Sequence, residues 1–191
     1  WRQQNFEKAA SWFAKASEQG HTSAQESLGW MYQHGEGVPQ DDKQALYWYT
    51  KAAAQGDSDA QIALGDMYVD GNGVAQDSLK AFDWYTKAAK QEDPLAQVKL
   101  GVMYFNGTVV PKDISKACDL FRKSAEQGNA DAQYNLGYAY LTGNGVPTDG
   151  KQAVFWYNKA AEQGQTNAQQ ALADIYKTGN IVQRDEKLAA Y

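Results

Sequence analysis

The stretch that decides the fold is AQIALGDMYVDGNGVAQDSLKAFDWYTKAAKQE, residues 60–92, because close copies of it follow one another along the chain. An Ala-Gln pair recurs every 36 residues, beginning at Ala24, Ala60, Ala96, Ala132 and Ala168. The residues equivalent to Leu64, Gly65, Tyr68 and Asp77 recur at the same interval. A fixed period of this length is typical of repeat proteins in which each repeat is one supersecondary unit.

Each period contains two helical patterns. In the first, Ala60, Leu64, Met67 and Tyr68 lie at i, i+4, i+7 and i+8, the spacing of one face of an α-helix. Gly65 lies beside this face. Glycine inside a helix costs about 1 kcal/mol relative to alanine, so its recurrence predicts that another helix backbone passes close by.

Turn and capping residues separate the helices. Asp57 and the pair Asp93-Pro94 are typical helix starts, and Gly71 is a typical helix end in the left-handed conformation. Asp77 is expected to cap the second helix. That helix ends at Gly56, Gly128 or Gly164 in three repeats, whereas Glu92 takes the place of glycine in another.

The second helix carries its own apolar face of Ala81, Tyr85, Ala88 and Ala89. A single helical hairpin cannot bury such faces, whereas stacked hairpins can. We therefore predict an all-α solenoid of 36-residue helix-turn-helix repeats that forms one continuous domain. The predicted divisions are a partial repeat at 1–20, full repeats at 21–56, 57–92, 93–128 and 129–164, and a partial repeat at 165–191. Because neither end shows a polar capping repeat, we expect a fragment of a longer array.

Composition excludes several function classes. The 191 residues carry a net charge of −5, one cysteine and two histidines. The acidic balance argues against nucleic acid as a partner. A single cysteine excludes an internal disulfide framework, and two histidines offer little material for a metal centre. No apolar run approaches the ~18 residues of a membrane span, and no secretory signal is recognised at the first residues.

The repeat pattern A-x-x-x-L-G-x-x-Y-x-x-G-x-G-V-x-x-D-x-x-x-A-x-x-W-Y-x-K-A-A-x-Q-G is similar to the Sel-1-like repeat, a relative of the tetratricopeptide repeat, and covers essentially the whole chain. One repeat departs from it, with Thr108-Val109 at the glycine turn and Leu120-Phe121 for Trp-Tyr, which leaves its turn geometry open. The resemblance implies a right-handed superhelix whose first helices line a concave surface, and adaptor or immunity roles. Cysteine-rich relatives linked to β-lactam binding are a poor match, because this chain has only Cys118.

The face of the first helices opposite the core varies between repeats, so folding does not dictate it. In the middle repeats it is apolar and aromatic, which is typical of an interaction surface. The candidate partner-binding residues are Trp30, Ile62, Asp66, Val69, Asp70, Val98, Val102, Phe105, Tyr134, Tyr138 and Leu141. The alternative interpretation is that these side chains pack against neighbouring first helices.

Asp66 and Asp70 lie at i, i+4 near a helix C-terminus, where acidic groups oppose the helix dipole and repel one another. Recognition of a basic group on a partner is one interpretation. Two solvated carboxylates that cost a few tenths of a kcal/mol are the other.

No catalytic, metal-binding or cofactor-binding residue is predicted. His21 and His34 occupy different repeat offsets, Cys118 takes the place of an apolar residue, and no nucleophile lies in a recognisable pairing with a base.

We therefore predict a scaffold that binds a protein or an extended peptide in its concave groove, without nucleic acid or membrane insertion; the oligomeric state stays open. One alternative is an immunity protein that neutralises a secreted bacterial toxin. Another is an envelope glycan-binding module or enzyme, in which Trp30, Phe105, Tyr134 and Tyr138 stack on sugars. The resemblance favours a periplasmic or secreted bacterial protein.

Overall fold

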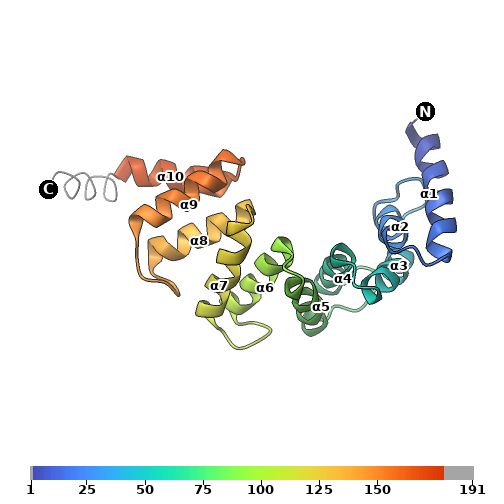
Figure 1. Cartoon of the computed structure of the whole chain (residues 1–191), viewed down its shortest axis with the longest axis horizontal. Helices are drawn as coiled ribbons and strands as arrows, with labels where there is room; N and C mark the ends of the chain where they lie inside the picture. The colour runs from blue at the N-terminus through green and yellow to red at the C-terminus, as the bar shows by residue number, and fades with distance from the viewer. Residues whose placement is uncertain (1, 179–191) are drawn as a thin grey trace. The chain divides into compact units, whose positions relative to one another are not determined.

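The computed structural model describes residues 2–178, and every regular element in this range is an α-helix. The helices are α1 (Arg2–Glu18), α2 (Thr22–His34), α3 (Asp42–Ala54), α4 (Ser58–Asp70), α5 (Ser78–Lys90), α6 (Pro94–Asn106), α7 (Ile114–Glu126), α8 (Ala130–Thr142), α9 (Gly150–Glu162) and α10 (Thr166–Thr178). Figure 1 shows them joined by short turns in chain order. The predicted all-α class built from helix-turn-helix repeats is confirmed.

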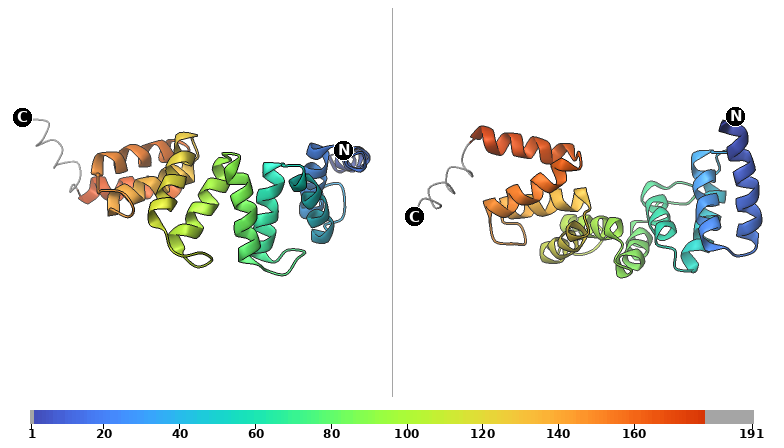
Figure 2. Two further views of the ribbon diagram at one scale, coloured as in Figure 1. Left: turned by 60° about the horizontal axis from the view of Figure 1, so that its bottom comes forward. Right: turned by 45° about the horizontal axis from the view of Figure 1, so that its top comes forward.

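The chain forms two compact units that divide between Ala96 and Gln97, so each unit is described by itself. In the first unit, α1 packs on α2, α2 on α3, α3 on α4 and α4 on α5. In the second, α7 packs on α8, α8 on α9 and α9 on α10 (Figure 2). In the pairs α2–α3, α4–α5 and α8–α9, the first helix of a repeat therefore contacts the second helix of the same repeat. One continuous domain and a right-handed superhelix both stay predictions.

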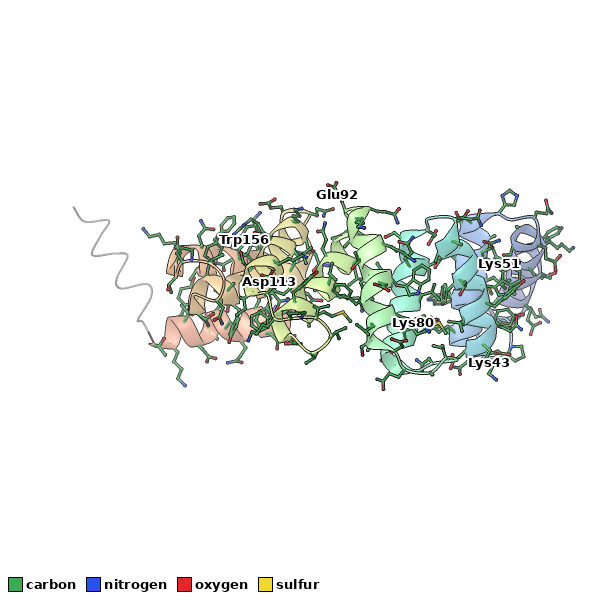
Figure 3. The ribbon with its side chains drawn as sticks, turned by 90° about the horizontal axis from the view of Figure 1, so that it is seen from below. Lys43, Lys51, Lys80, Glu92, Asp113 and Trp156 are labelled. Carbon is green, nitrogen blue, oxygen red and sulfur yellow. The ribbon has the colours of Figure 1, made fainter. Side chains whose placement is uncertain are left out.

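The predicted caps are confirmed. The Asp57 carboxylate accepts a hydrogen bond from the Ala60 N–H at 2.8 Å, and Asp77 accepts one from the Lys80 N–H at 3.0 Å. Asp113, labelled in Figure 3, accepts one from the Lys116 N–H at 2.9 Å. Gly71 ends α4 with φ +78°. These local bonds satisfy helix-end groups that would otherwise lack partners, so α4, α5 and α7 begin, and α4 ends, where the sequence indicates.

The close approach predicted at Gly65 comes first from a ring. A side-chain carbon added there would lie 2.6 Å from Cδ1 and 2.9 Å from Cζ of Tyr85, and at the equivalent Gly137 the backbone oxygen of Ala153 also comes within 3.2 Å. Gly29 faces Tyr49 and Gly101 faces Phe121 in the same way. The glycine is a socket for the aromatic residue of the second helix, and this contact joins the two helices of a repeat.

Small residues fill the rest of the core. In the first unit, Ala45, Ala52 and Ala60 are fully buried and let the helices approach closely, while Tyr49 and Leu64 supply bulk. The second unit repeats this arrangement around Phe121 and Leu136, and around Tyr157 and Leu172. Burial of these apolar side chains is the main force that holds hairpin to hairpin.

Buried glutamines that hydrogen-bond between repeats were not predicted. Each of them is the glutamine of the Ala-Gln pair that marks the period. The Gln61 amide group donates to the Ala53 carbonyl at 3.2 Å, and its oxygen accepts a hydrogen bond of 2.9 Å from the Gln91 side chain. Gln25 and Gln133 make equivalent bonds to Gln55 and Gln163. The side chain satisfies a buried carbonyl at the end of one second helix and ties it to the end of the next.

The loop that joins the two helices of a repeat has a second glycine with positive φ in every described full repeat except the one with Thr108-Val109. Gly37, Gly73 and Gly145 all have positive φ there, and an added carbon on Gly73 would lie 2.5 Å from the Asp42 carbonyl oxygen. The equivalent Val109 does not have positive φ. This loop therefore takes a different path, which answers the question that its sequence left open.

Glu92 lies in the turn after α5 (Figure 3) and has φ +63°, among the described residues the single non-glycine with positive φ. We expect Glu92→Gly to raise the free energy of unfolding by about 0.5–1 kcal/mol, because glycine adopts this conformation without steric cost. Gly56→Ala is the matched reverse change, since Gly56 has φ +95° and open space around it, and it should destabilise by a similar amount. Urea denaturation measures both; a loss of stability in Glu92→Gly contradicts the argument.

Candidate functional site

The candidate residues on the first helices differ in their exposure. Trp30, Val102 and Tyr138 are exposed, at 41%, 39% and 41%, and Asp70 is also exposed. The half-buried ones are Asp66, Val69, Phe105, Tyr134 and Leu141. Ile62 and Val98 are buried, at 5% and 7%. Most of the predicted face thus stays open to solvent within its own unit.

Ile62 and Val98 belong to the core, as the alternative interpretation of the sequence has it. Both occupy the repeat offset of Tyr134, and Val98 packs in a cluster with Phe121 and Leu136. A short aliphatic side chain at this offset is covered by its neighbours, whereas the longer Tyr134 reaches the surface. We therefore leave Ile62 and Val98 out of the proposed contact surface.

In the first unit, tyrosines of the second helices reach polar groups on the first helices. The Tyr49 hydroxyl donates to the Gln33 side-chain oxygen at 2.9 Å, and the Tyr85 hydroxyl donates to the Asp66 carboxylate. Burial raises the pKa of both tyrosines, and the Asp66 carboxylate raises that of Tyr85 further. Asp66 thus has a structural partner, and the i, i+4 pair with Asp70 is not simply two solvated carboxylates.

In the second unit, the repeat formed by α6 and α7 replaces this polar pairing with apolar residues, whereas the next repeat keeps a tyrosine, Tyr157. Phe121 lies at the offset of Tyr49 and Tyr85 and lacks the hydroxyl, while Val102 lies at the offset of Asp66. Together they line a pocket of about 320 Å³ between α6 and α8, with Phe121 of α7 also contributing. The remaining lining residues are Phe105, Asn106, Tyr134, Asn135 and Tyr138. The structure therefore brings four predicted residues, Val102, Phe105, Tyr134 and Tyr138, to one pocket.

The walls of the pocket are aromatic and its polar groups are neutral. The Tyr134 ring lies 5.7 Å from the ring of the buried Tyr157, which supports it from behind. Asn106 and Asn135 add amide groups, and no lining residue is charged. Beside the pocket, the Lys112 ammonium lies 5.6 Å from the centre of the Phe105 ring. An apolar enclosure with a few oriented polar groups is typical of a binding site.

Charge is distributed unevenly along the chain. Residues 1–96 contain 14 Asp and Glu against 8 Lys and Arg, a net charge of −6, whereas residues 97–191 contain 9 against 10, a net charge of +1. In the first unit, burial raises the pKa of the Glu26 and Asp59 carboxyls, and the nearby Asp57 carboxylate adds to both shifts. The pocket thus lies in the unit without excess acid.

Lysine–aromatic pairs on the second helices are a further feature, and they were not predicted from the sequence. The Lys87 ammonium lies 3.7 Å from the centre of the Trp84 ring, and Lys51, labelled in Figure 3, lies 5.3 Å from that of Trp48. The three-residue spacing of Trp and Lys was the available signal, because such residues are neighbours on a helix. These pairs cover aromatic surface rather than form a catalytic group.

Two further features of residues 2–178 bear on function. No group of three or more His, Cys, Asp or Glu side chains in this range is arranged to hold a metal ion. None of the helices in the same range combines the length and apolar character needed to cross a membrane.

The Sel1 repeat motif matches this chain six times, at residues 2–21, 22–57, 58–93, 94–129, 130–165 and 166–191. No curated protein matches the chain significantly.

Three solved structures of bacterial proteins are similar to this chain. A Sel1 repeat protein from Oxalobacter formigenes is 45% identical with a TM-score of 0.82, over 89% of this chain and 50% of that one. The protein c5321, a protective antigen of uropathogenic Escherichia coli with an SLR fold, is 36% identical with a TM-score of 0.84, over 91% and 37%. The immunity protein Pa5087 from Pseudomonas aeruginosa is 26% identical with a TM-score of 0.57, over 83% and 59%. This chain thus spans half or less of the first two relatives.

Proposed function

Because the chain belongs to the Sel1 repeat family, a family of protein-interaction modules, we propose that it is a binding scaffold that anchors a segment of another protein in the pocket between α6 and α8. Leu141, on a first helix of the same unit, would widen this contact surface. In the first unit, Trp30 and Val69 would offer a contact surface of their own, and Asp66 and Asp70 would favour basic groups there. The chain needs no cofactor and no catalytic group for this role.

The observation that carries the proposal is that two equivalent positions of the repeat hold a hydrogen-bonded polar pair in the first unit and two apolar residues at the pocket. In the first unit, Tyr85 and Asp66 satisfy each other by a hydrogen bond at this place in the repeat. The second unit has Phe121 and Val102 there, and both line the pocket. The fold accepts the polar pair, so the apolar pair is not required for folding. Apolar surface that folding does not require supports a role in binding.

We expect the double variant Val102→Asp/Phe121→Tyr to fold and to lose binding at least about tenfold, since it copies the Asp66–Tyr85 pair into the pocket and removes the apolar anchor. Peptides selected from a display library against the unaltered chain serve as ligands. Fluorescence anisotropy measures their affinity for each variant, and circular dichroism measures helicity.

Phe155→Asp is the matched control. Like Val102→Asp, it exchanges an exposed apolar residue of the second unit for an acid, but Phe155 lies on the second helix α9 and does not line the pocket. Its affinity for the selected peptides should equal that of the unaltered chain. Full affinity of the double variant would remove the pocket from the proposal.

A second candidate function is that of an immunity protein, which the likeness to Pa5087 favours. On this view the partner is a secreted toxin, and one equivalent of the chain abolishes the activity of that toxin. The glycan-binding alternative predicts instead that free saccharides perturb the pocket resonances in NMR spectra while the selected peptides fail to compete with them.

A further inference from the structure

We propose that the pocket between α6 and α8 receives an extended peptide in which an acidic side chain directly adjoins an aliphatic one. This inference rests on the proposed function and adds the conformation and the charge of the bound segment. It concerns the second unit alone.

The two asparagines indicate the conformation of the peptide. Asn106 is the last residue of α6, and Asn135 lies in the second turn of α8, so they border the pocket from both helices that form it. An asparagine side chain carries one acceptor and two donors, which match the N–H and C=O of a peptide group. A helical ligand has already used these groups internally, whereas an extended ligand offers them.

The walls indicate the anchoring side chain. Val102, Phe105, Phe121 and Tyr138 enclose a volume of about 320 Å³ without a charged group. This volume lies at the small end of ligand pockets and suits one side chain with its adjoining peptide groups rather than a large ligand. A branched aliphatic side chain fills such a space against aromatic faces and leaves no polar atom buried without a partner.

The acidic position follows from Lys112. An added carbon on Gly107 would lie 2.6 Å from Lys112 Cβ, so Lys112 lies against the turn directly after Asn106. Its ammonium extends over the ring of Phe105, which lines the pocket. Asp131, the acidic residue in the first turn of α8, accepts a hydrogen bond of 3.3 Å from Gln165 and is not a lining residue. A carboxylate on the ligand therefore meets a cation at the Asn106 edge of the pocket.

Two capped heptapeptides test this inference. Both place a single leucine in a glycine–serine background; one has aspartate on both sides of the leucine and the other has lysine there. Titrations at millimolar concentration are followed by ¹⁵N–¹H NMR of the unaltered chain. We expect the aspartate peptide to shift the side-chain amide signals of Asn106 and Asn135 and to bind at least three-fold more tightly than the lysine peptide. Lys112→Gln should remove this preference, as should 0.5 M salt.

The outcomes separate this inference from the proposed function. If both peptides bind equally and both lose affinity in Val102→Asp/Phe121→Tyr, the pocket is an anchor site without charge selectivity and only this inference is wrong. Absence of any shift with the aspartate peptide also overturns this inference. If that double variant binds both peptides as tightly as the unaltered chain does, both this inference and the proposed function are wrong.

Discussion

Replacing Gly65 by alanine is expected to lower the free energy of unfolding by about 2 kcal/mol, although alanine is the better helix former by about 1 kcal/mol. The added methyl group would lie within 2.6–2.9 Å of Cδ1 and Cζ of the Tyr85 ring. Tyr85 cannot move aside easily, because it is 3% exposed and its hydroxyl is held by Asp66. The steric cost should therefore outweigh the gain in helix propensity. Chemical denaturation followed by circular dichroism measures the change.

A double-mutant cycle identifies the cause. In a Tyr85→Leu background the ring is gone, so Gly65→Ala should cost at most half as much and could reverse sign towards the helix-propensity gain. An undiminished cost in that background would falsify the socket interpretation. In that case the close approach of another backbone, which the sequence predicts, would be the better explanation.

Local features of this fold could be predicted from the sequence because their causes lie within a few residues. The Asp57 and Asp77 caps and the positive φ of Gly71 depend on hydrogen bonds and steric limits inside one turn. The repeat period also predicts that the two helices of each repeat pack together, since every hairpin must bury the same apolar face. The element order therefore follows from the sequence alone.

Contacts across repeats were harder to predict. Periodicity places Val98, Val102 and Phe105 on one face of α6, but it does not say how far the neighbouring helices cover that face. Val98 is buried, whereas Val102 is exposed and lines the pocket. The stronger signal was the departure of one repeat from the others: the Leu120-Phe121 exchange removes the hydroxyl that reaches a polar partner in the first unit. Phe121 lines the pocket. From the sequence, this departure bore only on the geometry of the neighbouring turn.

The glutamine pairs were missed for a related reason, because the hydrogen bonds of Gln61 join residues 8 and 30 positions away. We expect Gln61→Leu to lower the free energy of unfolding by about 1–3 kcal/mol. Leucine is of similar size, but it removes two hydrogen bonds at a buried position. The Ala53 carbonyl loses the bond from Gln61 and keeps that from the Gly56 N–H at 3.1 Å, and the Gln91 side-chain amide loses its acceptor. This cost should be visible as a lower urea midpoint with an unchanged denaturant slope.

Gln169→Leu is the matched control, because Gln169 occupies the same repeat offset and donates to the Ala161 carbonyl at 3.1 Å, but it is exposed. Water can replace its bond, so this change should cost no more than about 0.5 kcal/mol. Gln91 is the other member of the pair, since its side chain donates to the Gln61 oxygen. Gln91→Ala should destabilise the unaltered chain modestly and have no further effect in Gln61→Leu, because the bond between the two side chains is already lost. Additive losses in the double variant would mean that the pair does not act as a unit, and that the recurrence of glutamine reflects the carbonyl contact alone.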